Sequence, residues 1–345
     1  MVNGTRSTSR NRSRDRQVLR LAIPALGALA AEPTYLLVDT SIVGHLGTTQ
    51  LAGLSIAATF LGSAFWLFNF LAYGTTAQVS RLHGARDREA SGAVAAQALW
   101  LALAIGVGLV IVGEALAPQI VALLQGKGAV AAKAETYMRI SFLGAPFVMV
   151  VLAGEGYLRG VQRMTTPLKI LVVSNLANVL LELWFVYGLH WDIAGSAWGT
   201  VFAQAGAAVA FGTVMVRAAA GRLRVAWARM RTLLRLGGDL VLRTAALLIV
   251  FNVTVALLAA SGKVPLAAHE VILQIFLFLA LTLDALAVAA QTLIGSHLGA
   301  GDAVKARALA RRITLISLVT GIGVAAVLLA GSTVIPGAFT GDAAM

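Results

Sequence analysis

The sequence predicts an all-α, polytopic membrane protein, and three observations lead to this fold class. Of the 345 residues, 59% are hydrophobic and only 12% are charged, and the mean hydropathy is +0.84. A soluble domain has about a quarter charged residues, because its surface must be hydrated. The chain also contains apolar runs long enough to cross a bilayer, and part of its first half is repeated in its second half. These features exclude a soluble enzyme and a disordered tail.

Nine apolar runs, each bounded by a charge, Gly or Pro, have the length of a transmembrane helix. A hydrocarbon core about 30 Å thick is crossed by roughly 20 helical residues. The runs are 18–43, 52–79, 93–117, 136–158, 168–189, 193–216, 233–260, 266–296 and 313–335. In the same order, each lies beside Arg16, Arg81, Pro118, Arg159, Pro167, Arg217, Arg231, Pro265 or Arg312. Strands would alternate apolar and polar residues over about 10 positions, and 99–112 does not alternate. A helical bundle is therefore expected.

The basic residues are distributed unequally between the two sides of this bundle. The N-terminal tail and the loops on its side hold most of the Lys and Arg, whereas the opposite side holds only Lys127, Lys133 and Lys263. Cytoplasmic loops retain basic residues. The N-terminus is therefore expected on the cytoplasmic side of the membrane. The net charge of +12 and the pI of about 11.0 are then a topology signal, and no nucleic-acid partner is expected.

Three short motifs recur 215 residues apart. Leu19-Arg20-Leu21 recurs as Leu234-Arg235-Leu236, and Leu51-Ala52 recurs as Leu266-Ala267. Gly84-Ala85-Arg86-Asp87 recurs as Gly299-Ala300-Gly301-Asp302. Three matches at one spacing indicate a duplicated unit. The second copy of the first helix lies in mid-chain, where no signal peptidase acts. The first helix is therefore expected to be retained, although its arginine-rich start also resembles a cleavable signal peptide.

The repeat divides the chain into two lobes. A basic tail (1–16) precedes a six-helix lobe (17–217), and a basic linker (218–232) leads to the second lobe (233–345), which has three helices. Six helices return the chain to its starting side, so the units are expected to be parallel repeats about an axis along the membrane normal. A complete second unit would need three more helices, or about another 90 residues by the repeat spacing. The sequence is therefore expected to be C-terminally incomplete.

The first helix carries two acidic residues, Glu32 and Asp39. A charge at the centre of a membrane helix costs about 2.5–3.5 kcal/mol on insertion scales, so it needs a reason. The two residues are seven apart and share a face, with Tyr35 between them. Such a face suits an aqueous cavity in which a carboxylate gains and loses a proton. The alternative for Glu32 is a solvated position near a kink at Pro24 or Pro33.

The fifth helix carries a polar stripe made of Asn175, Asn178 and Glu182. Lipid offers no hydrogen bonds, so the stripe requires polar partners within the protein. The simplest arrangement places it against the Asp39 face of the first helix. Two carboxylates in a low-dielectric cavity cannot easily both ionise, so one is expected to exchange a proton in the physiological range. The alternative is that Asn178 and Glu182 only hold helices together.

The second unit does not reproduce this chemistry, because the position equivalent to Asp39 is Thr254. Its membrane segments carry Arg243, Glu270, Gln274 and Asp284 as further cavity candidates. Asp284 is alternatively expected to pair with Arg243 in a structural bridge.

The sequence lacks the residue patterns of metal sites, nucleotide-binding sites and common catalytic sites. There is no cysteine, and no cluster of His or carboxylates has the spacing of a metal site. No Walker loop, nucleophile elbow or dinucleotide fingerprint is present. We therefore expect no enzyme activity, no cofactor and no metal.

A set of short motifs is distributed along the chain. They are Pro24, 38–47 (VDTSIVGHLG), 158–160 (LRG), Thr166-Pro167, Asn178 to Glu182, 195–200 (GSAWGT), Ala267-Ala268-His269 and 284–287 (DALA). With these motifs the sequence resembles the multidrug and toxic compound extrusion (MATE) transporters, in the branch related to DNA-damage-inducible protein F. The similarity extends from residue 17 to the end.

The resemblance implies a twelve-helix transporter of two six-helix lobes that expels cationic or amphiphilic organic compounds in exchange for H⁺ or Na⁺. The family's cation-coupling site lies in the N-terminal lobe. The matching positions here are Asp39, Asn178, Glu182 and Thr200, with Tyr35 as a neighbour. Family members commonly have Asp where this chain has Glu182. Small organic substrates and membrane lipid are the expected partners, and a monomer is expected.

Two other functions stay open from the sequence. One is flipping of a lipid-linked precursor, which favours a cavity lined by several Arg or Lys; only Arg243 qualifies. The other is a non-transporting remnant that lacks part of its second lobe.

Overall fold

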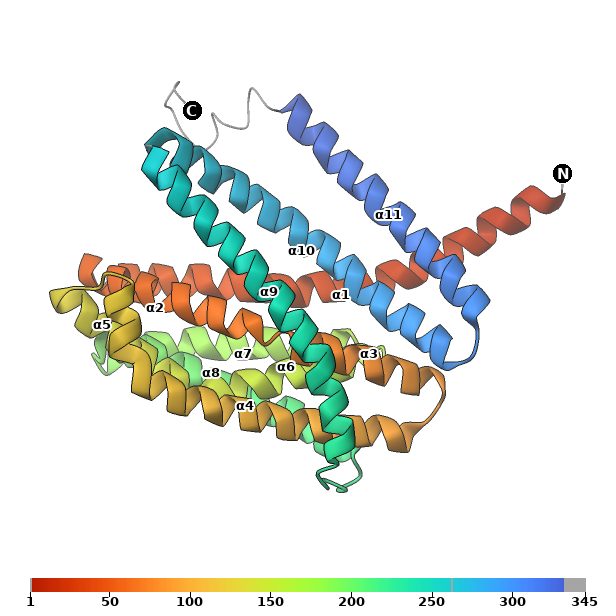
Figure 1. Ribbon diagram of the computed structural model, residues 1–345, viewed down its shortest axis with the longest axis horizontal. Helices are drawn as coiled ribbons and strands as arrows, with labels where there is room; N and C mark the ends of the chain where they lie inside the picture. Colours follow the sequence, from red (N-terminus) through yellow and green to blue (C-terminus); the bar gives the residue numbers. More distant parts are fainter. Residues whose placement is uncertain (1, 262, 332–345) are drawn as a thin grey trace.

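The computed structural model describes residues 2–261 and 263–331, and every regular element within these ranges is helical. The description leaves out the side chains of residues 2–14, 228, 229, 236, 256, 259–261, 263–268, 270 and 271. The elements are α1 (Val2–Gly44), α2 (Thr48–Leu67), α3 (Phe70–Gly84), α4 (Arg88–Leu123), α5 (Gly128–Leu143), α6 (Ala145–Gly160), α7 (Thr165–Leu183), the π-helix η1 (Trp184–Gly188), α8 (Asp192–Ala218), α9 (Trp227–Ser261), α10 (Lys263–Gly299) and α11 (Ala303–Ala330) (Figure 1).

The multi-pass helical bundle is confirmed. Eight helices among the described residues are long and apolar enough to cross a membrane, and there are nine spans if the bent pair of α5 and α6 counts as one. They follow the order of the nine runs expected from the sequence. Two boundaries differ: residues 2–16, expected as a tail, continue α1, and α9 already begins at Trp227, inside the expected linker.

Two of the expected single helices are interrupted in the structure. The run 52–79 is divided at Phe68 and Asn69 into α2 and α3. The run 136–158 is divided at Gly144, where α5 and α6 meet at a bend of 50°. Pro146 lies in the first turn of α6 and has no N–H with which to continue the hydrogen-bond ladder of α5.

The repeated motif folds in the same way in both units. α3 and α10 each end in a tight turn, and the aspartate of the motif caps the next helix. Asp87 Oδ1 accepts a hydrogen bond from the backbone N–H of Ala90 at 2.9 Å, and Asp302 Oδ1 accepts one from Lys305 N–H at 2.9 Å. A side-chain oxygen at this position satisfies an N–H that has no partner within the helix. The 215-residue spacing is therefore a structural repeat.

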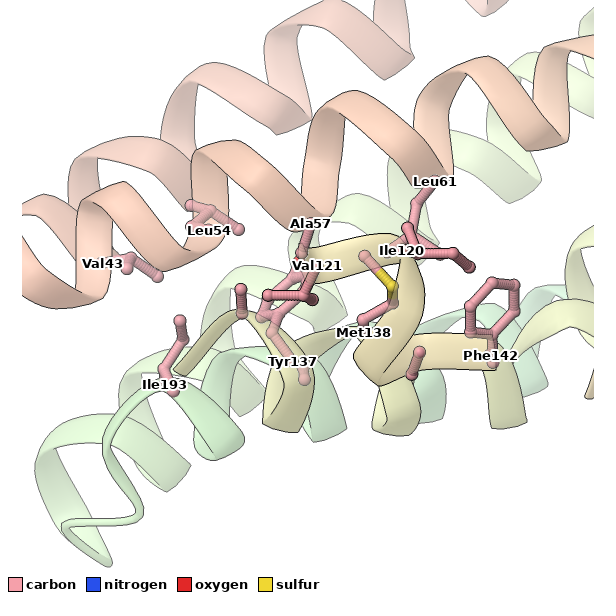
Figure 2. Packing of buried hydrophobic residues seen from close by; sticks show 13 residues of the cluster. Val43, Leu54, Ala57, Leu61, Ile120, Val121, Tyr137, Met138, Phe142 and Ile193 are labelled. Carbon is pink, nitrogen blue, oxygen red and sulfur yellow. The ribbon is translucent and has the colours of Figure 1, made fainter. Parts of the chain in front are cut away.

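Helices α1 to α8 pack into one lobe, with α6 against α3, α4 and α8. Figure 2 shows one of its apolar cores, in which Tyr137, Met138 and Phe142 of α5 pack with Leu61 of α2 and Ile120 of α4. In lipid there is little hydrophobic drive between helices, so close packing must hold them together. Among the described side chains, this lobe carries most of those that are buried.

In the second unit, the start of α9 packs against α3 and α4, whereas α10 and α11 meet this lobe at one end. A core cluster joins Val18 of α1, Leu293 of α10 and Ile313 of α11. By contrast, Ile272 and Phe278, nearer the start of α10, are exposed. Figure 1 shows α10 diverging from α1 toward that start. We refer to the end where α3 and α10 finish, around residues 80–84 and 295–299, as the joined end.

Two glycines of α4 allow a matched test of close helix packing. A Cβ added at Gly106 would overlap the backbone of Pro146 in α6, whereas one added at Gly108 has no neighbour within 4 Å. Gly106→Ala is therefore expected to destabilise the protein by about 1–3 kcal/mol through overpacking. Gly108→Ala is expected to be neutral or slightly stabilising. Thermal unfolding in detergent, followed by circular dichroism, compares the two; equal midpoints would contradict the packing role of Gly106.

Candidate functional site

Asp39 of α1 is the centre of a polar cluster inside the first lobe. Its side chain is only 2% exposed. The Ser196 hydroxyl of α8 donates a hydrogen bond to Asp39 Oδ1 at 2.5 Å, and the Tyr137 hydroxyl of α5 donates a longer one to Oδ2 at 3.4 Å. The carboxylate is thus held from two other helices.

Glu182 of α7 is fully buried and lies beside Asp39 and Ser196, close enough to both for electrostatic interaction. Neither of its carboxyl oxygens has a hydrogen-bond partner among the described residues. A buried polar atom without a partner is costly. Such an atom requires an explanation such as a bound proton, ion or water.

Thr200 of α8 joins the remaining polar groups of the cluster. The Tyr35 and Thr200 hydroxyls share a hydrogen bond at 2.9 Å, and Asn178 Nδ2 donates to Thr200 Oγ1 at 3.2 Å. The amide oxygen of Asn178 has no partner in the described part of the chain. Together with Glu182, it gives the cluster three unpartnered acceptor oxygens.

Small residues of α8 bring this helix close enough to α7 to build the cluster. A Cβ at Gly199 would lie 3.1 Å from the backbone nitrogen of Glu182, and one at Gly195 would lie 2.9 Å from the carbonyl carbon of Phe185. Ser196 and Thr200 each follow one of these glycines and lie one turn apart on the same face. The π-helix η1 begins two residues after Glu182, and such segments often lie at functional sites.

The cluster has the composition of a site for a proton or a small cation. Two carboxyl groups that are buried this deeply cannot easily both carry charge. If one carboxyl is protonated, its O–H can donate a hydrogen bond to an oxygen of the other carboxyl. A hard cation would be bound by the same oxygens.

Five residues expected to form the site therefore lie together: Tyr35, Asp39, Asn178, Glu182 and Thr200. Asn175 does not join them, because its amide donates to the backbone oxygen of Ala31 at 2.9 Å. Glu32 is also separate; it is exposed and lies within electrostatic range of Glu155 of α6.

The sequence did not indicate Ser196 and Tyr137 as members of this cluster. Ser and Tyr are common in membrane helices, and no charge marks them. The one available signal was the spacing of Gly195 and Gly199, which places Ser196 and Thr200 on one close-packed face.

The candidates of the second unit do not form a cluster of their own in the described residues. Arg243 and Gln274 are exposed, and the Glu270 side chain lies outside the description. The expected bridge between Asp284 and Arg243 is wrong. Asp284 Oδ2 instead accepts a hydrogen bond from the Tyr73 hydroxyl of α3 at 2.9 Å. The prediction failed because the partner comes from the other unit of the repeat.

Arg159 also differs from its expected place in a basic loop. It lies in the last turn of α6, is 6% exposed and forms a buried ion pair with Glu155. The two residues are four apart, which places them on one helix face.

Comparison with known proteins agrees with this architecture. The family model described as MatE matches residues 24–184 and 240–345. The chain belongs to the MATE family of transporters. It is 32% identical over 299 residues to DNA damage-inducible protein F of Escherichia coli K12. The aligned segment covers 84% of this chain and 65% of that protein. It is also 32% identical over 332 residues to Protein DETOXIFICATION 44, chloroplastic, of Arabidopsis thaliana, covering 90% of this chain and 62% of that one.

Solved structures of MATE transporters share the fold. A MOP superfamily transporter from Pyrococcus furiosus superposes with a TM-score of 0.85 at 20% identity, covering 96% of this chain and 75% of that one. A structure described as MATE in the bent conformation gives 0.85 at 21% identity, covering 93% and 74%. The chain spans slightly under two thirds of the length of the two curated relatives named above.

The role of Thr200 in this MATE protein can be tested by removing its hydroxyl. Thr200→Val leaves the Asn178 amide and the Tyr35 hydroxyl without their partner, so we expect a loss of about 1–3 kcal/mol of stability. Thr213→Val on the same helix is the control, because the Thr213 hydroxyl is exposed and bonds only Val209 O of its own helix. Thermal unfolding in detergent compares the two variants. A Thr200→Val midpoint equal to that of the control would remove Thr200 from the cluster.

Proposed function

We propose that this protein is a secondary active antiporter that exports cationic or amphiphilic organic compounds in exchange for protons. The observation that supports this most directly is the buried pair of Asp39 and Glu182, with both oxygens of Glu182 unpartnered. Membership of a transporter family supports this class of activity. The names of relatives support efflux of drugs, since one is a probable multidrug resistance protein NorM of Chromobacterium violaceum, 28% identical over 310 residues.

The proposed coupling follows from charge. With one carboxyl ionised, the cluster attracts a cationic substrate or retains a cation. A proton arriving from outside neutralises the cluster and favours release of the substrate. The site can then close around a neutral cluster, which lowers the free-energy cost of burying it. Deprotonation on the inner side then resets the carboxyl. The two units alternate between outward and inward openings during this cycle.

The proposed location is the bacterial plasma membrane, with the N-terminus in the cytoplasm. The basic residues support this orientation. Arg81, Arg88, Arg163 and Arg217 lie at helix ends on one side of the bundle, and that side carries the turns after α3, α6, α8 and α10. By the positive-inside rule this side, which includes the joined end, faces the cytoplasm.

Lipid-linked precursor flipping receives less support. It favours several Arg or Lys around one cavity to hold a pyrophosphate group. Arg243 is exposed on α9, and the charge of Arg159 is already balanced by Glu155.

Transport by the chain in proteoliposomes tests the proposal. With a pH gradient and a cationic dye as substrate, we expect Asp39→Asn and Glu182→Gln each to reduce transport about tenfold or more, because an amide cannot take up a proton. Glu114→Gln is the control, since Glu114 is a half-buried partner of Arg139 away from the cluster. Full transport by both site variants would show that the coupling site lies elsewhere.

The coupling ion is tested in the same system by replacing the pH gradient with a Na⁺ gradient. We expect a pH gradient alone to drive dye movement. Transport that needs the Na⁺ gradient and ignores the pH gradient would assign the site to Na⁺.

A further inference from the structure

At the joined end, α3 and α10 cross with their backbones in direct contact. A Cβ at Gly84 would overlap the backbone of Ser296, and a Cβ at Gly299 would overlap the backbone of Arg81. Gly84 and Gly299 are repeat equivalents, as are Arg81 and Ser296. The two contacts are therefore the same contact made twice, which is the property of an interface on a two-fold axis. The axis of the repeat passes between α3 and α10 here.

A polar contact next to this crossing breaks the symmetry. The Tyr73 hydroxyl of α3 donates to Asp284 Oδ2 of α10 at 2.9 Å, and Gln291 Nε2 of α10 donates to the Tyr73 backbone oxygen at 3.0 Å. Residues 284 and 291 lie two turns apart on one face of α10. Tyr73 is thus held at its hydroxyl and at its backbone by the opposite unit.

The repeat equivalents of this pair cannot make the same bond. Tyr73 corresponds to Val288, and Asp284 corresponds to Asn69. Valine has no donor, so the interface carries a tyrosine-to-carboxylate bond on one side of its axis only. This position has diverged between the units while the glycine crossing stayed the same.

A second cross-unit contact lies near the outer edge of the same end. Arg312 of α11 donates from Nε and Nη2 to the two carboxylate oxygens of Asp15 in α1, at 2.7 and 2.6 Å. Both side chains are partly exposed, so water screens this pair. The Tyr73 and Asp284 bond lies deeper, within electrostatic range of Glu155 and Arg159.

We propose that Tyr73 and Asp284 form a polar latch that keeps the two units together at the joined end. A hydrogen bond to a carboxylate is stronger than a neutral one, and the Asp284 carboxylate would lose it in a low-dielectric region. Separation at this end therefore requires either water or a new partner for Asp284.

The latch rests on the proposed function, because it assumes that the two units alternate between two arrangements. It acts on the separation of the units and does not involve the coupling residues. It assigns Asp284 a role in holding the conformation, whereas the sequence suggested a place in the cavity or a bridge to Arg243. The bond opens when the joined end opens, and it forms again when that end closes.

A distance measurement tests the latch. The chain has no cysteine, so Arg88→Cys and Ala303→Cys provide unique spin-label sites. These exposed residues are repeat equivalents in the first turns of α4 and α11, beside the joined end. In lipid nanodiscs, double electron–electron resonance between the labels reports the fraction of molecules separated at this end. In the Tyr73→Phe variant we expect the ratio of separated to joined molecules to rise about tenfold, the effect of losing a hydrogen bond to a charged group.

Asp284→Asn keeps an acceptor and is expected to give a smaller rise. Tyr187→Phe is the matched control, because it removes a hydroxyl that donates to Ile42 O within the first lobe at 3.1 Å; no rise is expected. An unchanged distribution in both Tyr73→Phe and Asp284→Asn, or an equal rise in Tyr187→Phe, would overturn the latch. Dye transport is measured separately, so a failure of the antiporter proposal leaves this readout intact.

Discussion

In a bilayer a polar side chain can be satisfied only by another part of the protein, and this constraint decides how the helices of this chain pair. Asp39 of α1 requires donors, and Ser196 and Tyr137 supply them from α8 and α5. Asn178 of α7 requires an acceptor, and Thr200 of α8 supplies one. Apolar packing alone would allow many arrangements of such helices. The polar groups select one of them.

The sequence predicted the spans because about 20 apolar residues in a row have few other uses, and it predicted Asp39 and Glu182 because charges in such runs are costly. It did not predict the bend at Gly144, since an interior proline such as Pro146 does not always break a membrane helix: Pro24 and Pro33 lie inside the continuous α1. It did not predict the partner of Asp284, because Tyr73 lies 211 residues away. Spacing within one helix indicates faces, whereas partners depend on three-dimensional packing.

The two units of the repeat share their turns and caps but differ in chemistry. Thr254 stands where the first unit has Asp39, and its hydroxyl bonds Val250 O within α9. The glycine crossing at Gly84 and Gly299 is present in both units because it is geometric: any Cβ there would meet backbone. Polar side chains are free to diverge wherever the backbone contact does not depend on them. Duplication thus preserved the interface while the proposed coupling site stayed in one unit.

Helix α1 extends from the polar cluster to the apolar core between the two units. Near its C-terminal end it carries Asp39, and closer to its start Val18 and Ala25 pack with α10 and α11 in the core between the units. Pro24 and Pro33 each remove one backbone hydrogen bond between these points, which lowers the cost of bending. A change of charge at Asp39 alters what α1 must satisfy at one end, while its other end lies in the interface that would have to separate. Helix α1 is therefore a continuous covalent link along which a proton at the cluster would influence the core between the units.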